Sequence, residues 1–176
     1  MFTLTTFIAL TLAWQSAPGA LQSVYTSLAA PDCKTVSTNE EGARSTQRCP
    51  GAGGYALLVE DADSRMSVTV VAPDGKKHDL RYWQVVTTAF SEIGRKAEWR
   101  VKRQGRRDVP VALIVRLNAS EDGEHPEKKT SYLVVAKVTP QQVCVTDRIA
   151  PAADANEQAR SAADTASSRP CVEAQE

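Results

Sequence analysis

VALIV, at residues 111–115, is apolar at every position. Successive side chains of a strand point to opposite faces of its sheet, so this segment predicts a central strand that is covered on both faces. A second run of the same kind, YLVVAKV at residues 132–138, follows the polar loop at residues 118–129. The two runs together predict a sheet whose centre is buried on both sides.

Turn signals split the neighbouring sequence into further runs that are rich in apolar and β-branched residues, as is typical of strands. Gly105 marks a hairpin between two of these runs, and Pro73-Asp74-Gly75 marks a tight turn between two others. One helical turn is expected over residues 89–94, although residues 83–93 also fit a helical stripe. The predicted strands are residues 24–28, 55–60, 66–71, 77–88, 97–103, 109–117, 132–138 and 143–149.

Beyond Pro151 the sequence changes to a helical pattern. Asp154 with Glu157 resembles a capping box, and small residues recur along one face of the helix, namely Ala155, Ala159, Ala162, Ala163 and Ala166. A stripe of alanines buries little apolar area, so we expect this helix to dock weakly by itself. The predicted fold class is therefore α+β and mainly β. It is an antiparallel sheet or flattened barrel of about six to eight strands with a C-terminal helix.

The chain contains four cysteines and no Cys-x-x-Cys pair, which favours two disulfides in an oxidising compartment. Of the three possible pairings we predict the local one, Cys33–Cys49 and Cys144–Cys171. Loops of this size each stabilise a fold by about 3 to 4 kcal/mol in the chain-entropy model. The second bridge would hold the alanine helix against the last strand. His78 and His125 lie far from any metal-ligand spacing, so we expect no metal site.

Residues 1–19 have the features of a signal peptide, because a short, uncharged apolar run is followed by small residues. The run is too short to cross a bilayer core of about 30 Å. We therefore expect cleavage near Gly19 or Ala20, export to the periplasm or the extracellular space, and no integral membrane protein. A buried N-terminal strand or helix is the alternative. The predicted organisation continues with a loop-rich segment at residues 20–54, a β-sheet domain with the helix at 55–171, and a tail at 172–176.

Basic and acidic residues balance at 21 each, so no overall field attracts nucleic acid. The charges are not evenly distributed along the chain, because residues 95–107 contain seven basic residues and one acid, Glu98. In a strand Glu98 would share one face with Arg100 and Lys102, while Trp99 would point into the core. This basic hairpin could bind an anionic envelope component or an acidic protein. The alternative is that the hairpin is a sheet edge whose charges serve only to keep the protein soluble. The predicted partner-binding residues are Arg95, Lys96, Arg100, Lys102, Arg103, Arg106 and Arg107.

No motif in the sequence predicts catalysis. There is no Gly-x-Ser-x-Gly, and His78 with Asp79 is the one local pair of suitable types. The glycines at residues 51–54 lack the Lys-Ser/Thr of a phosphate loop, so we expect no cofactor. The sequence predicts a non-catalytic secreted or periplasmic binding or structural module. The alternative is a small secreted hydrolase whose site assembles from distant residues, and a buried carboxylate in a cleft beside His78 or a serine hydroxyl would favour it.

Overall fold

The structure is a computed structural model, and it describes residues 20–39 and 44–174. The predicted signal peptide, residues 1–19, lies outside the described residues. Within the described ranges ten strands form one mixed sheet, which confirms the α+β, mainly β fold class. The strands are β1 Gln22–Ser27, β2 Lys34–Thr38, β3 Arg44–Pro50, β4 Ala56–Ala62, β5 Arg65–Val71, β6 Lys77–Asp79, β7 Ser91–Gln104, β8 Arg107–Ala119, β9 Thr130–Val138 and β10 Val143–Ile149. The helices are η1 Ala30–Asp32, α1 Tyr82–Val85, α2 Ala155–Thr165 and η2 Ala166–Ser168.

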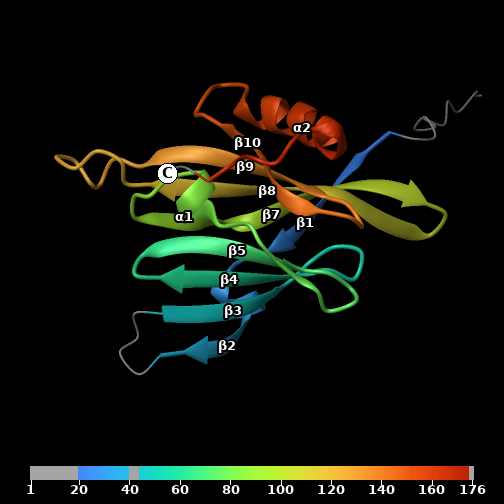
Figure 1. The fold of residues 1–176 in the computed structure, drawn as a ribbon, viewed down its shortest axis with the longest axis horizontal. Helices are drawn as coiled ribbons and strands as arrows, with labels where there is room; N and C mark the ends of the chain where they lie inside the picture. Colours follow the sequence, from blue (N-terminus) through green and yellow to red (C-terminus); the bar gives the residue numbers. More distant parts are fainter. Residues whose placement is uncertain (1–19, 40–43, 175–176) are drawn as a thin grey trace, which may run out of the picture.

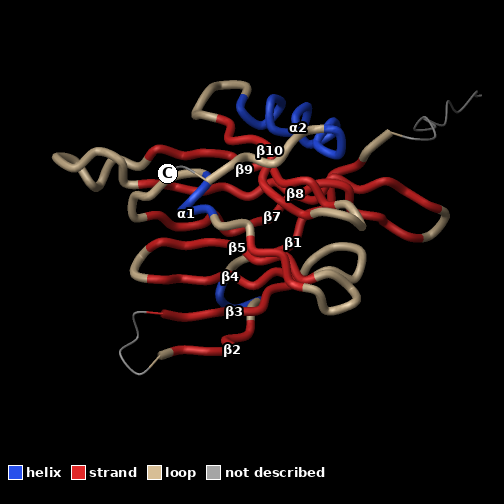
Figure 2. Tube along the Cα trace, in the orientation of Figure 1, coloured by secondary structure: helices blue, strands red, loops and turns tan. Residues whose placement is uncertain are grey.

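The sheet runs in the order β10-β9-β8-β7-β5-β4-β3-β2, with β1 beside β7 and β6 beside β5 (Figures 1 and 2). Strand β7 connects its two halves. One edge of β7 pairs with β8 along the strand, while the other edge meets β5 at Ser91 and then β1 at residues 96–101. The contact with β5 is parallel and consists of one residue pair, Arg65 with Ser91.

The two halves of the sheet enclose one core. Trp99 and Leu113 from one half, Leu57 and Val68 from the other, and Tyr82 of α1 all belong to the same buried cluster. Trp99 is fully buried, as predicted, and its indole Nε1 donates a hydrogen bond of 3.0 Å to the hydroxyl of Thr26 in β1. Strand β1 is therefore fixed to the core by the side chains that point inward from it.

Helix α2 covers the opposite face of β8 and β9 (Figure 1). Its alanine stripe packs on Ala112, Ile114, Leu133 and Val135 of these strands. The strands that the sequence marked as apolar on both faces thus have a core on each face, as predicted. The buried helix residues are those of the expected stripe, Ala155, Ala159, Ala162, Ala163 and Ala166.

The predicted strand at residues 77–88 is wrong beyond Asp79. Arg81 has a left-handed backbone with φ 48°, which ends the strand, and α1 follows it. A short helix forms here, but the stripe expected over residues 83–93 is not its buried face: Tyr82, Val85 and Val86 are buried. Trp83 and Phe90 of that stripe are exposed. The expected helical turn at residues 89–94 is also wrong, because β7 begins at Ser91.

The described part of residues 20–54 contains three strands, whereas the sequence predicted a loop-rich segment with one. Strand β3 pairs with β4 from Arg44 to Pro50, and β2 adds an outer edge on which all five residues are exposed. The disulfide Cys33–Cys49 joins this hairpin at its base, and Cys144–Cys171 joins β10 to the segment after α2. Both predicted pairings are confirmed. No helix within the described ranges is long and apolar enough to cross a membrane.

Candidate functional site

The hairpin of β7 and β8 projects beyond the strands on either side of it (Figure 1). Pairing with β1 stops at Val101, and pairing with β9 begins at Ala112, so residues 102–111 form a two-stranded ribbon with both edges free of strand partners. A two-residue turn closes the ribbon, and Gly105 takes the positive φ of 60° that the turn requires. We call residues 102–108 at its end the basic ribbon.

The basic ribbon carries four basic residues and one acid. Lys102, Arg106 and Arg107 are exposed, and the described residues place no carboxylate within ion-pair distance of them. Arg103 donates to the carboxylate of Asp108, 2.7 Å away. Three uncompensated cations therefore lie within six residues at one end of the molecule.

Arg100 lies inside the fold. It is 8% exposed, and its guanidinium donates to both carboxylate oxygens of Asp164 in α2, at 2.6 and 3.0 Å. It also donates to the Ser23 hydroxyl at 2.6 Å and to the Leu21 carbonyl at 3.1 Å. The guanidinium of Arg100 is thus engaged by α2 and by the N-terminal segment around β1 rather than by solvent.

Glu98 of β7 forms a second ion pair with α2, with the two charges exchanged between the elements. Its carboxylate accepts from Nε of Arg160 in α2 at 2.7 Å and from the Ser23 hydroxyl at 2.5 Å. Burial by itself raises the pKa of Glu98, but the hydrogen bonds from Arg160 and Ser23 outweigh burial and lower it. We call Ser23, Glu98, Arg100, Arg160 and Asp164 the crossed ion pairs. They bind α2 to β7, and they neutralise the middle of the basic stripe that the sequence predicted.

Arg95 and Lys96 form a separate exposed pair, and a bulge explains why. Ile93 pairs with Leu117 and Ala97 with Val115, so residues 94–96 of β7 lie opposite the single residue 116. A Cβ on Gly94 would come within 2.9 Å of the Cβ of Arg116, so this close approach needs glycine. The irregular backbone leaves both adjacent basic side chains exposed, whereas a regular strand would turn them to opposite faces.

These two residues border a hollow of about 450 Å³ where β1 ends. The other lining residues are Tyr25, Thr26, Ser27, Ala29 and Asp32. We call it the Tyr25 hollow. Tyr25 is 52% exposed there, although its hydroxyl contacts Nη2 of Arg160 at 3.2 Å. The described residues form no ion pair with Arg95 or Lys96.

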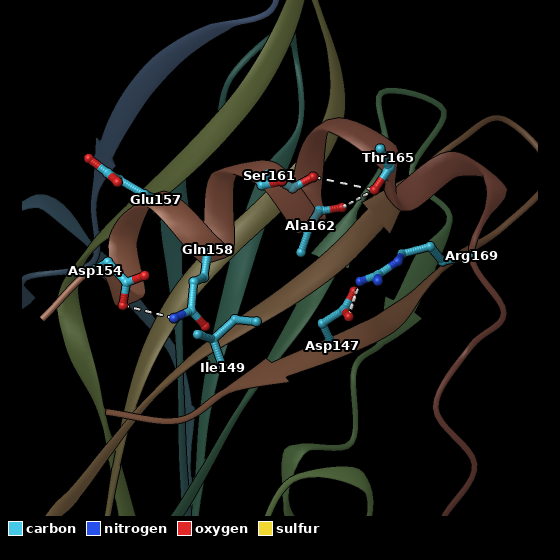
Figure 3. A pocket seen from close by; sticks show the side chains of 9 residues that line it. All are labelled: Asp147, Ile149, Asp154, Glu157, Gln158, Ser161, Ala162, Thr165 and Arg169. Atoms are coloured by element: carbon cyan, nitrogen blue, oxygen red, sulfur yellow. Dashed lines mark hydrogen bonds and ion pairs between the residues drawn. The ribbon is translucent and has the colours of Figure 1, made fainter. Parts of the chain in front are cut away.

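A second groove, of about 470 Å³, lies between α2 and β10 (Figure 3). Its polar groups contact one another. Asp147 is paired with Arg169, and Asp154 accepts from Nε2 of Gln158 at 2.8 Å. The expected capping box is therefore wrong, because the Asp154 side chain does not bond the helix backbone. Oδ2 of Asp147 is buried without a hydrogen-bond partner. The Thr165 hydroxyl, which also lines the groove, donates to the backbone carbonyls of Ser161 and Ala162 (Figure 3).

One contact resembles the arrangement that would favour a hydrolase, since the Ser23 hydroxyl bonds the carboxylate of Glu98. However, neither residue lines the Tyr25 hollow or the groove beside α2, and a carboxylate whose pKa is lowered is a poor proton acceptor. Burial and the charge of Lys76 lower the pKa of His78, against a smaller opposing effect of Asp74. Within the described ranges no three metal-ligating side chains cluster.

Comparison of this chain with protein-family models, with curated proteins and with solved structures finds no match.

Proposed function

We propose that this protein is a non-catalytic binding module that acts outside the reducing cytosol and contacts an anionic partner through its basic hairpin. The observation that carries the proposal is the basic ribbon. Lys102, Arg106 and Arg107 have no acidic partner among the described residues, and they project from the body of a chain with no net charge. Local excess charge on such a projection attracts an oppositely charged partner and orients it during encounter.

The buried residues at the base of the ribbon support this role. The ribbon continues directly from Trp99 and Val101, which are completely buried, so its base is rigid. A rigid base lowers the entropy lost when the exposed side chains engage a partner. The seven predicted residues do not act alike, because Arg100 is used within the fold. Arg103 is also paired, with Asp108, so the proposal rests on the other five residues.

The two disulfides support a location in an oxidising compartment, since such bridges persist outside the cytosol. We propose that the chain reaches this compartment by export, with residues 1–19 as the signal peptide. Anionic glycans, lipid headgroups and acidic proteins all occur on that side of a membrane, and each would meet the ribbon by the same electrostatic attraction.

The test compares two triple variants with equal loss of charge. The ribbon variant is Lys102→Gln/Arg106→Gln/Arg107→Gln, and the control is Lys34→Gln/Lys76→Gln/Lys128→Gln, whose residues are exposed elsewhere on the molecule. Binding of the mature protein is measured against polygalacturonate, poly-glutamate and phosphatidylglycerol vesicles.

We expect binding of at least one of these polyanions to weaken by about tenfold or more in the ribbon variant, with a much smaller loss in the control. Binding should also weaken between 0.1 and 1 M salt, as the Debye length falls from about 10 to about 3 Å. Equal losses in the two variants, or binding that ignores salt, would contradict the proposal.

A further inference from the structure

We propose that the Tyr25 hollow is a binding site for an acidic sugar, meaning a sugar ring that bears a carboxylate or a sulfate. This inference rests on the proposed function and names the chemistry of the partner. Its first support is charge: Arg95 and Lys96 line the hollow side by side and have no acid paired with them in the described residues. A guanidinium beside an ammonium is suited to an anionic group, which it can bind by charge-assisted hydrogen bonds.

The second support is the aromatic ring. Tyr25 is 52% exposed on β1, a strand that pairs with β7 along one edge. Its hydroxyl is held by Arg160, and Arg160 is itself fixed to Glu98 at 2.7 Å. The ring is thus positioned before a ligand arrives, and it presents a rigid, flat apolar surface at low entropic cost. The C–H face of a pyranose is the complement of such a surface.

The third support is a set of groups that suit hydroxyls rather than a bare anion. The Ser27 hydroxyl oxygen accepts from the backbone N–H of Ala29 at 3.1 Å, which leaves its own hydrogen free to donate. The Asp32 carboxylate, also in the lining, accepts hydrogen bonds, which the hydroxyls of a sugar can donate. A ligand with hydroxyls and one acidic group satisfies both kinds of partner.

Size and position agree with a glycan. The hollow, at about 450 Å³, lies within the usual range of ligand sites, roughly 300–1,000 Å³. Lys96 and Lys102 are six residues apart on β7, a distance of roughly 20 Å at the rise of a strand. Between them the crossed ion pairs present no free cation. Along β7, an acidic oligosaccharide seated in the hollow would therefore meet its next uncompensated cation at the basic ribbon.

The experiment is calorimetric titration of the mature protein with two probes, trigalacturonate and a sulfated chondroitin tetrasaccharide. Maltotriose is the neutral control, and inorganic phosphate is the bare-anion control. The hollow variants are Arg95→Gln/Lys96→Gln, Tyr25→Ala and Tyr25→Phe, beside the ribbon triple variant. Thermal unfolding checks that each variant is folded.

We expect at least one acidic oligosaccharide to bind, maltotriose and phosphate to bind at least about tenfold more weakly, and affinity to fall by about tenfold in Arg95→Gln/Lys96→Gln, which is about 1.4 kcal/mol. Tyr25→Ala should lose a similar factor, whereas Tyr25→Phe, which keeps the ring, should retain most of the affinity. Rescue by phenylalanine separates contact with the ring from a structural role of the Tyr25 hydroxyl.

The outcomes also separate this inference from the proposed function. If poly-glutamate or anionic vesicles bind through the ribbon while both acidic sugars fail, or if the sugars bind hollow variants and wild type equally, the sugar site is wrong and the binding module stands. Phosphate that binds as tightly as the sugars would reduce the hollow to a simple anion site and overturn the inference. If no polyanion binds at all, both proposals fail.

Discussion

Seven basic residues that are alike in the sequence have different environments in the structure. The guanidinium of Arg100 binds Asp164, Ser23 and Leu21, so this residue contributes to folding. Lys102, two residues along the same strand, is exposed to solvent. Sequence reasoning placed both on one face, but it could not see that Asp164 of α2 pairs with the first while the second stays exposed.

Replacing Arg100 with Gln should therefore destabilise the protein by about 2 kcal/mol, because this buried side chain loses its hydrogen bonds to Asp164, Ser23 and Leu21. Lys102→Gln, the matched control, should stay within about 0.5 kcal/mol of wild type. Urea unfolding curves of both variants measure the difference. A loss as small for Arg100 as for Lys102 would mean that the crossed ion pairs add nothing to stability.

Glu98 should make stability fall in acid. Its pKa is lowered in the folded protein, since the bonds from Arg160 and Ser23 outweigh the effect of burial. A carboxylate with a lowered folded pKa stabilises the fold above its unfolded pKa of 4.5, and this stabilisation is lost as pH falls toward the folded value. Thermal unfolding from pH 7 to pH 3 should show a smaller acid-induced decrease for Glu98→Gln than for wild type. Parallel curves for the two proteins would contradict this assignment.

Among the elements, α2 shows what a periodic sequence pattern can predict about a helix and what it cannot. All five alanines of its predicted stripe are buried, because spacing alone determines which side chains of a helix share a face. The same helix was expected to dock weakly, yet Arg160 and Asp164 extend its contact to β7. The sequence does show these two opposite charges four residues apart on the helix. It gives no indication of their partners, which lie more than sixty residues away.

Strands β2 and β3 show the opposite case. Their residues are polar and carry no alternation, so hydrophobic pattern gives no indication of them. The backbone of β4 pairs with β3, and the disulfide at Cys33–Cys49 keeps the outer strand in place. A strand that is stabilised by main-chain pairing and a covalent link needs no apolar face, which is why sequence reasoning assigned this stretch to a loop.

Removing each disulfide should loosen a different part of the molecule. The two bridges close loops of 16 and 27 residues and each contribute about 3 to 4 kcal/mol in the chain-entropy model. Hydrogen exchange should accelerate mainly in β2 and β3 for Cys33→Ala/Cys49→Ala. For Cys144→Ala/Cys171→Ala it should accelerate in α2 and the segment that follows it, while β7 and β8 stay protected. Acceleration spread evenly over the whole sheet in both variants would show that the bridges act globally.

At the scale of the whole molecule, the candidate sites differ in how well the sequence predicts them. The basic ribbon follows from a local charge count and a turn glycine, so it is visible in the sequence. The Tyr25 hollow joins residues seventy positions apart and depends on a bulge in β7. The sequence signal closest to that bulge is Gly94, and a lone glycine is equally compatible with a turn or a helix end. The hollow therefore becomes apparent only in three dimensions.

The proposed cleavage of the signal peptide is constrained by the same network. The Leu21 carbonyl and the Ser23 hydroxyl both bond Arg100, and β1 begins at Gln22, so cleavage must leave these residues in place. We expect the mature protein to begin at Ala20 or Leu21 and to contain no free thiol. Intact mass before and after alkylation, with the protein taken from its producing cells, measures both features. Cleavage beyond Ser23 would remove the hydroxyl that bridges Glu98 and Arg100 and so contradict the role of β1. A protein that keeps Met1 and takes up four alkyl groups without reductant would contradict export.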